Sequence, residues 1–290
     1  MANTIELAKG YVDALDEVYK NASVTADLVT APELMRPGAN AKEILYPQID
    51  VGGLGDYSRN SGYTTADVAV EWKSATFNYD RGTKIQVDAM DNQETFNIAF
   101  GRAAGELIRT KVAPEGDAFT FATLAGLTGI SKATAATYAD ASDFLTALIA
   151  AKNKMDEDEV PEEDRILYAT PTLLNGIMAL DTTKSREILA TFAATKRVPQ
   201  SRFYTAIDLL DGKSSGEKTG HYKKASAGKD INFMIIHKPA VIKFDKHVAS
   251  DIIPASQNTD YDADIVKYRK YGLVDAYKNK LAGIYLSHKA

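Results

Sequence analysis

The clearest pattern in this 290-residue chain is an alternation of apolar and polar residues near position 70. Val68, Val70 and Trp72 alternate with charged or small residues, which is typical of a half-exposed β-strand. The apolar residues that follow fall on odd positions, and this change of phase predicts a bend or bulge. The tripeptide at 80–82 predicts a short hairpin, because its glycine suits a tight loop. We therefore expect long antiparallel strands over 46–90, with the stretch GLGDYSRNSGY at one turn.

A helical pattern follows directly. Asp91 and Glu94 form a helix start signal, and apolar residues recur at helical spacing over 96–108. Pro114 is expected to end the helix, because proline lacks the backbone N–H that a helix interior uses. The sequence thus predicts one long helix over 91–113.

The two ends of the chain differ from the region between them. Residues 1–45 lack sustained periodicity, which predicts an arm made of a short helix and extended chain. Residues 125–230 indicate an α/β region, with helices expected at DASDFLTALIAAKNKM and TPTLLNGIMAL and strands at EDRILYAT and SRFYTAIDLL. Small polar residues and lysines over 211–230 predict a long exposed loop. The pattern over 231–290 is again that of β-strands.

Composition narrows the functional class. The chain is 45% hydrophobic and 25% charged, close to the average of soluble globular proteins. Its net charge of −5 is unfavourable for a protein that wraps nucleic acid. The absence of cysteine excludes disulfides, thiolate zinc sites and cysteine nucleophiles. No apolar run is long enough for a membrane span and no signal peptide is apparent, so we expect a soluble intracellular protein without a membrane partner.

The motifs of common enzymes are incomplete here. Gly53 and Gly55 begin a dinucleotide-like pattern, but Ser58 stands at its last glycine position and a strand follows instead of a helix. The GKS tripeptide at 212–214 lacks the earlier glycine of a phosphate-binding loop. The acidic run over 155–164 lacks the ligand spacing of a calcium loop, and the four histidines lack metal-ligand spacing. We therefore expect no catalytic site, cofactor or metal.

Several segments together resemble the major capsid proteins of tailed bacteriophages, which share a shell fold with herpesviruses. The resemblance covers most of the chain, and the segments occur in this order: GLGDYSRNSGY, VAVEWKS, DRGTKIQVDAMDNQET, RTKVAPEGDAF, SRFYTAIDLL and DADIVKYRKYGLVDAYKNKLAGIY. It implies an α+β fold with four parts: an N-terminal arm over 1–45, an extended β-hairpin loop over 46–90, a peripheral domain with a long spine helix over 91–125 and 235–290, and an axial α/β domain over 126–234.

The resemblance also implies a function. Copies of the chain would assemble as hexamers and pentamers into an icosahedral shell around double-stranded DNA, without sequence-specific binding. The virion would be assembled in the cytoplasm of the bacterial host. Portal and decoration proteins are implied partners, and an arm over 1–45 is too short for a cleavable scaffolding extension, so a separate scaffolding protein is expected.

Two groups of residues are expected to contact neighbouring subunits. Extended-loop contacts are expected from Asp56, Tyr57, Arg59, Asn60, Tyr63, Trp72, Phe77, Tyr79 and Arg81. Axial-loop contacts near the hexamer and pentamer centres are expected from Lys213, Lys218, His221 and Lys223. Two alternatives remain open. One is an encapsulin-type bacterial compartment, which has the same fold, and the other is a small-molecule enzyme or binding protein that uses the carboxylates at 156–164 or the lysines at 211–230.

Overall fold

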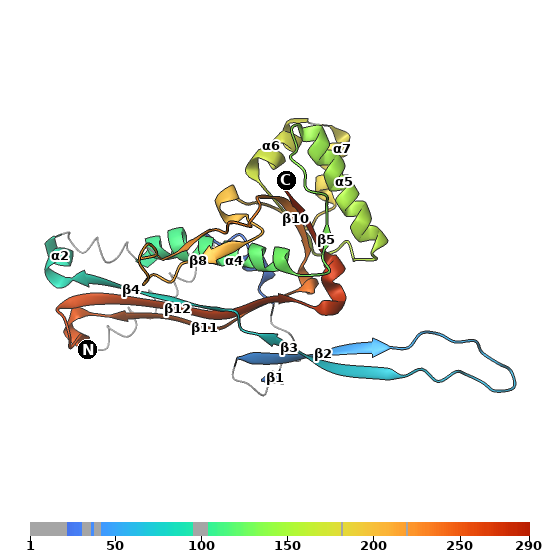
Figure 1. Cartoon of the computed structure of the whole chain (residues 1–290), viewed down its shortest axis with the longest axis horizontal. Helices are drawn as coiled ribbons and strands as arrows, with labels where there is room; N and C mark the ends of the chain where they lie inside the picture. The colour runs from blue at the N-terminus through green and yellow to red at the C-terminus, as the bar shows by residue number, and fades with distance from the viewer. Residues whose placement is uncertain (1–21, 31–35, 38–41, 95–103, 181, 219) are drawn as a thin grey trace.

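Three long strands form a sheet that runs along the longest axis of the molecule (Figure 1). The computed structural model describes residues 22–30, 36–37, 42–94, 104–180, 182–218 and 220–290. The sheet is antiparallel in the order β11-β12-β4, and its strands are β4 (Tyr79–Asp88), β11 (Val241–Ile253) and β12 (Ala263–Ala276). A short helix, α2 (Ala89–Glu94), follows β4 at one end of this sheet.

A second, mixed sheet lies in the helical body above the long sheet in Figure 1. Its order is β5-β13-β10-β6-β7, with strands β5 (Ser131–Lys132), β6 (Arg165–Ala169), β7 (Ala194–Arg197), β10 (Ile231–His237) and β13 (Ile284–His288). All seven residues of β10 are buried, which is why INFMIIH is an almost continuous apolar run instead of an alternating one.

Helices bury both faces of this second sheet. Helices α5 (Ala141–Glu157), α6 (Pro171–Leu180) and α7 (Thr183–Ala190) pack on one face, where Phe144, Leu148 and Phe233 are completely buried. Helix α4 (Ala113–Gly126) packs on the other face through Phe121, whose ring lies edge-on to Tyr168 and Phe203. The expected strand EDRILYAT and the two expected helices are confirmed by β6, α5 and α6.

The hairpin leaves the body as a separate ribbon (Figure 1). Its strands β2 (Glu43–Val51) and β3 (Val68–Thr76) are antiparallel, and β1 (Arg36–Pro37) pairs with the start of β2. The expected pair of long strands on either side of GLGDYSRNSGY is confirmed. The hairpin is shorter than the expected range, because β4 leaves it and pairs with β12 in the long sheet.

Short elements complete the chain. They are the 3₁₀ turns η1 (Ala26–Leu28), η3 (Gln200–Arg202), η4 (Lys238–Ala240), η5 (Ala255–Gln257) and η6 (Lys278–Gly283), and the two-stranded ribbon of β8 (Ile207–Leu209) and β9 (Tyr222–Lys224). The expected strand SRFYTAIDLL is therefore wrong over most of its length. A 3₁₀ turn opens this segment, and Phe203 enters the core from a turn.

Two turn signals in the sequence have other roles in the structure. Gly82 lies inside β4 opposite Arg269, so the expected hairpin at 80–82 is wrong. A Cβ atom at Gly82 would lie 2.9 Å from the Tyr268 carbonyl oxygen, which shows that the glycine permits close approach of β12. Pro114 does not end the helix, because a π-helical turn (η2, Ile108–Val112) precedes it and the helix continues to Gly126. The wider turn accommodates a residue that lacks the N–H for a regular helix.

Two predicted domain boundaries also differ. Strand β13 lies in the five-stranded sheet beside β10, so the last strand belongs to the helical body and not to the peripheral domain. Residues 22–30 were expected in an arm, but Leu28 is fully buried in the core of the body. The predicted arm over 1–21, and the part of the predicted spine helix over 95–103, lie outside the described residues.

Candidate functional site

One face of the hairpin is apolar and exposed. The pairs Pro47–Trp72, Ile49–Val70 and Val51–Val68 are directly opposite in the register of β2 and β3, and directly opposite residues share a face of the ribbon. The exposed fractions of Ile49, Val51, Val68, Val70 and Trp72 are 61%, 62%, 63%, 55% and 41%. We call these six residues the apolar hairpin face.

The opposite face of the hairpin is polar at the same level. Here Gln48 pairs with Glu71 and Asp50 with Ala69, and the Lys73 ammonium group donates a hydrogen bond to Glu71. Nearer the body this same face turns apolar. Ile44, Tyr46 and Ala75 are buried there against Phe77, Ile242 and Leu273.

This change of face explains the phase change in the sequence. The register from Glu43–Thr76 to Val51–Val68 is continuous, so the bulge expected after Trp72 is wrong. The apolar residues change phase because different faces of the hairpin are apolar along its length. At its base, one face packs against the body of the subunit. Farther out, the opposite face is apolar and exposed. Burial of each Val, Ile or Trp side chain in a contact would contribute about 1.5–3 kcal/mol.

The tip of the hairpin has a defined shape. Ser58 and Gly62 form a bridge around Arg59 and Asn60, and the rings of Tyr57 and Tyr63 are 4.9 Å apart. Gly62 has a φ of +77°, a conformation that favours glycine. The predicted contact residues Asp56, Tyr57, Arg59, Asn60 and Tyr63 are thus gathered at the tip, beyond the ends of β2 and β3.

Three predicted contact residues are instead used inside the subunit. Phe77 and Tyr79 are only 7% and 5% exposed. The Tyr79 hydroxyl donates to Glu115 Oε1 over 3.1 Å, and Arg81 Nε donates to the same oxygen over 2.8 Å. Their assignment to the extended loop is wrong because these residues lie at or beyond the point where the chain enters the long sheet.

The loop that carries the predicted axial residues lies beside β4. Arg81 Nη2 donates to the His221 carbonyl oxygen over 3.2 Å, which joins this loop to the long sheet. Lys213, Lys218 and Lys223 are exposed, so the loop is lysine-bearing and open to solvent as expected. A contact between these lysines and other subunits stays a prediction.

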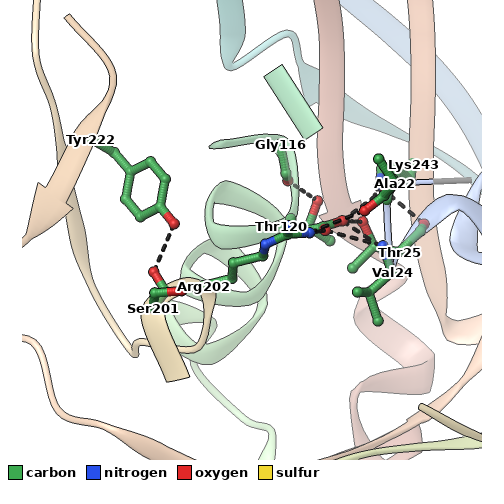
Figure 2. Close-up of polar contacts among 11 residues, drawn as sticks. Ala22, Val24, Thr25, Gly116, Thr120, Ser201, Arg202, Tyr222 and Lys243 are labelled. Atoms are coloured by element: carbon green, nitrogen blue, oxygen red, sulfur yellow. Dashed lines mark hydrogen bonds and ion pairs between the residues drawn. The ribbon is translucent and has the colours of Figure 1, made fainter. Parts of the chain in front are cut away.

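A buried carboxylate on α4 fixes the segment at 22–25, of which Ala22, Val24 and Thr25 are labelled in Figure 2. Asp117 is fully buried, and its oxygens accept hydrogen bonds from the hydroxyls of Ser23 and Thr25 and from the N–H groups of Val24 and Thr25. Arg202 Nη1 lies 3.1 Å from Asp117 Oδ2 and forms an ion pair with it. Local sequence patterns give no sign of this cluster, because Asp117 is 92 positions from Thr25.

A buried lysine completes the cluster. Lys243 Nζ on β11 donates to the Thr25 carbonyl oxygen over 3.1 Å and to the Thr25 hydroxyl over 2.6 Å (Figure 2). Burial, reinforced by the nearby Lys270 ammonium group, lowers the pKa of Lys243 to about 8. The folded protein therefore releases this proton at a lower pH than the unfolded chain, whose lysines titrate near 10.4.

This pKa difference predicts a pH dependence of stability. Between about pH 8 and 10.4 the unfolded state binds more protons at position 243, so the free energy of unfolding rises with pH in that window. From pH 8 to 9.5 the native protein should gain about 1.5 kcal/mol relative to Lys243→Met, because the slope rises over this range from about half of 1.4 kcal/mol per pH unit to most of it. Denaturant unfolding of both proteins across this range measures the difference, and parallel pH profiles would contradict it.

Two of the carboxylates proposed for an enzyme are held in structural ion pairs. Asp156 pairs with Lys152 over 2.9 Å and with Arg165 over 2.6 Å, and Asp158 pairs with Lys154 over 2.5 Å. Within the described ranges, no group of three or more histidine or carboxylate side chains is placed to hold a metal ion. In that same part of the chain, no helix is both long enough and apolar enough to cross a bilayer.

Solved structures with the same fold are known from phages and from a related particle. A structure from Mycobacterium phage Che8 has a TM-score of 0.59 at 13% identity, covering 91% of this chain and 90% of its own. The capsid structure of the cyanophage P-SCSP1u has a TM-score of 0.58 at 12% identity, and the match covers 93% of this chain and 88% of the cyanophage chain. A virus-like particle from Pyrococcus furiosus has a TM-score of 0.59 at 10% identity, and the match covers 97% of this chain and 99% of the Pyrococcus chain. No family model and no curated protein sequence matches the chain.

These likenesses define the class of fold. The chain shares its fold with solved phage capsid structures, as the sequence resemblance implied.

Proposed function

We propose that this chain is the major capsid protein of a tailed bacteriophage, and that copies of it assemble as hexamers and pentamers into an icosahedral shell around double-stranded DNA. The observation that carries the proposal is the apolar hairpin face, a one-sided apolar surface on a projecting ribbon of a capsid fold. The protein would be part of the virion, assembled in the cytoplasm of the host.

The hairpin gives a physical reason for assembly. A contiguous apolar surface on a soluble protein marks a contact with another molecule. A second copy of the chain is the occupant that we propose, because the face is exposed on a ribbon that projects from the body and has the polar tip residues beyond it. Each copy would cover the hairpin of one neighbour and extend its own over another, which is a head-to-tail contact that closes into rings.

The proposed contact divides the hairpin into two roles. Trp72 and its apolar neighbours would be buried against the neighbouring copy, and Arg36, whose guanidinium lies 4.7 Å from the centre of the Trp72 ring, would lie at the edge of that contact. The tip residues Asp56, Arg59 and Asn60 would supply polar contacts farther out. A scaffolding protein, a portal and decoration proteins are the other partners that we propose.

A second candidate is a shell protein of an encapsulin-type compartment. It is favoured by the likeness to the Pyrococcus particle, because the match covers 99% of the Pyrococcus chain and 97% of this chain. The two candidates predict the same kind of shell with different contents, which are packaged DNA in the first case and protein cargo in the second.

Assembly of the purified full-length chain tests the proposal. Size-exclusion chromatography and negative-stain electron microscopy should show shells, rings of six or five copies, or sheets of such rings. A stable monomer over the whole accessible concentration range would contradict the proposal. Particles recovered from infected or natural host cells should contain double-stranded DNA, and particles filled with a protein cargo would favour the compartment instead.

A further inference from the structure

A basic cavity lies between the loop at 210–221, strand β4 and the helix that leads into α4. Its volume is about 520 Å³, which is in the range of small-molecule sites. Four cationic residues, Arg81, Lys111, Lys213 and Lys218, line it with their side chains available to the cavity. Lys84 also belongs to the lining, but its side chain is on the other face of β4, because Lys84 pairs with Lys267 whereas Thr83 pairs with the lining residue Tyr268. Only two carboxylates, Glu115 and Asp211, line the cavity with the four cations, so it carries a net charge of +2 in a chain whose total is −5.

The Glu115 carboxylate already forms hydrogen bonds and ion pairs with groups of its own subunit. Its Oε1 atom accepts hydrogen bonds from Tyr79 and Arg81, and its Oε2 atom lies 3.4 Å from Arg81 Nη2 and 3.6 Å from His221 Nδ1. Burial opposes ionisation, but the adjacent His221, Arg81 and Tyr79 together hold the pKa of Glu115 below its usual value. It is therefore a carboxylate whose charge is compensated by Arg81.

The Asp211 carboxylate likewise forms hydrogen bonds with groups of its own loop. Its carboxylate accepts hydrogen bonds from the N–H groups of Lys213 and Ser214 and from the Ser214 hydroxyl. The Ser214 hydroxyl and these N–H groups hold the pKa of Asp211 at about 2, so the group is ionised at neutral pH.

The three lysines that face the cavity have no such partners. Within the described part of the chain, no carboxylate lies within ion-pair distance of Lys111, Lys213 or Lys218. Lys111 is on the π-helical turn and the other two are on the loop, and Arg81 on β4 adds a cation from a third segment. A bound anion would compensate the mutual repulsion of three ammonium groups around one cavity.

The backbone of the loop also opens toward the cavity. Gly212 and Gly220 line it, with φ values of +72° and +59°, and neither carries a side chain that would shield the peptide groups. His221 itself has a φ of +71°, which is unusual for a residue with a side chain. The strained conformation is held by Arg81, which donates to the His221 carbonyl oxygen.

We propose that this cavity binds a small polyphosphate anion, such as inorganic tripolyphosphate or the triphosphate of a nucleotide, which joins the loop to β4 and the helix. Lysine ammonium groups are point charges that bind phosphate oxygens from several directions. The cations come from several segments around one cavity of about 520 Å³, so a chain of phosphates suits it better than a single phosphate, because the chain brings more charge and more length. The proposal concerns the single subunit and does not depend on shell assembly.

Calorimetric titration of the subunit with sodium tripolyphosphate tests the proposal. The native protein should bind one tripolyphosphate per subunit, and Lys111→Gln with Lys213→Gln should weaken binding about tenfold or more, since each lost charge contact contributes a factor of a few. The matched control is Lys132→Gln with Lys184→Gln, two exposed lysines outside the cavity, and it should bind like the native protein. All four lysines are exposed, so both variants should fold.

Three outcomes would overturn the proposal. Equal affinity of the cavity variant and the control variant would mean that binding follows the total charge. Equal affinity for inorganic phosphate and tripolyphosphate would remove the requirement for a polyanion. Displacement of tripolyphosphate by duplex DNA at the same phosphate concentration would mean that the basic cavity binds nucleic acid instead of a small anion.

Discussion

Replacing Val70 with lysine is expected to abolish shell assembly while leaving a folded, soluble subunit. Val70 stands in the middle of the apolar hairpin face, opposite Ile49, and its side chain is 55% exposed in the subunit. In the proposed contact the lysine ammonium would be buried without a partner. At roughly 3 kcal/mol for each contact, the yield of particles should fall about 100-fold or more. Many copies of the same contact close the shell, so the loss is multiplied.

The control for this variant is one residue away. Ala69→Lys adds the same charge to the same exposed strand, but on the polar hairpin face opposite Asp50. Its particles should form in normal yield, as counted by electron microscopy. Both subunits should unfold within about 0.5 kcal/mol of the native protein, as is usual for exposed positions. Similar particle yields from the two variants would show that assembly does not use the apolar face.

Replacing Asp117 with alanine is expected to cause the largest loss of stability. The variant leaves the Arg202 guanidinium without its buried partner and deprives Val24 and Thr25 of the acceptor for their N–H groups. Removing one partner from such a buried pair costs about 3–5 kcal/mol. In a chain of this size the melting temperature should fall by about 10 °C, at roughly 2–4 °C for each kcal/mol.

Hydrogen exchange can show which part of the Asp117→Ala subunit loses stability, in addition to the size of that loss. Hydrogen exchange at the amides of Val24 and Thr25 should lose protection in Asp117→Ala before the core of the five-stranded sheet does, because these amides donate directly to the missing carboxylate. Glu187→Ala, which removes an exposed carboxylate on α7, should change neither readout. Unchanged protection in Asp117→Ala would mean that other contacts, such as those of Leu28, fix the segment.

Several elements were predictable because their signals are local. Helices α5 and α6 have apolar residues at helical spacing, and the strands of the hairpin alternate with a period of two on either side of a glycine-rich turn. The run INFMIIH indicated a strand, and the structure shows it buried on both faces. The order of segments along the chain was specific enough to suggest the fold, which solved phage structures share.

Other features were misread because the local signal has two meanings. Glycine in DRG suits both a turn and a close approach between strands, and only the pairing of Gly82 with Arg269 decides between them. Pro114 suits both the end of a helix and the first turn after a π-helical segment. Phe77 and Tyr79 are large aromatic residues next to the hairpin, and only the tertiary structure shows that they are buried in their own subunit.

The sequence by itself determined most of the helices and strands and their order, because helix and strand periodicity and turn chemistry depend on residues that are neighbours along the chain. The class of fold came from the resemblance of several ordered segments to tailed-phage capsid proteins. The tertiary structure alone decided which face of the hairpin stays exposed, where the last strand returns, and which distant groups meet at Asp117 and in the basic cavity. These features depend on strand pairing and packing between segments that can lie more than two hundred positions apart, such as Thr25 and Lys243, and no local pattern carries that information.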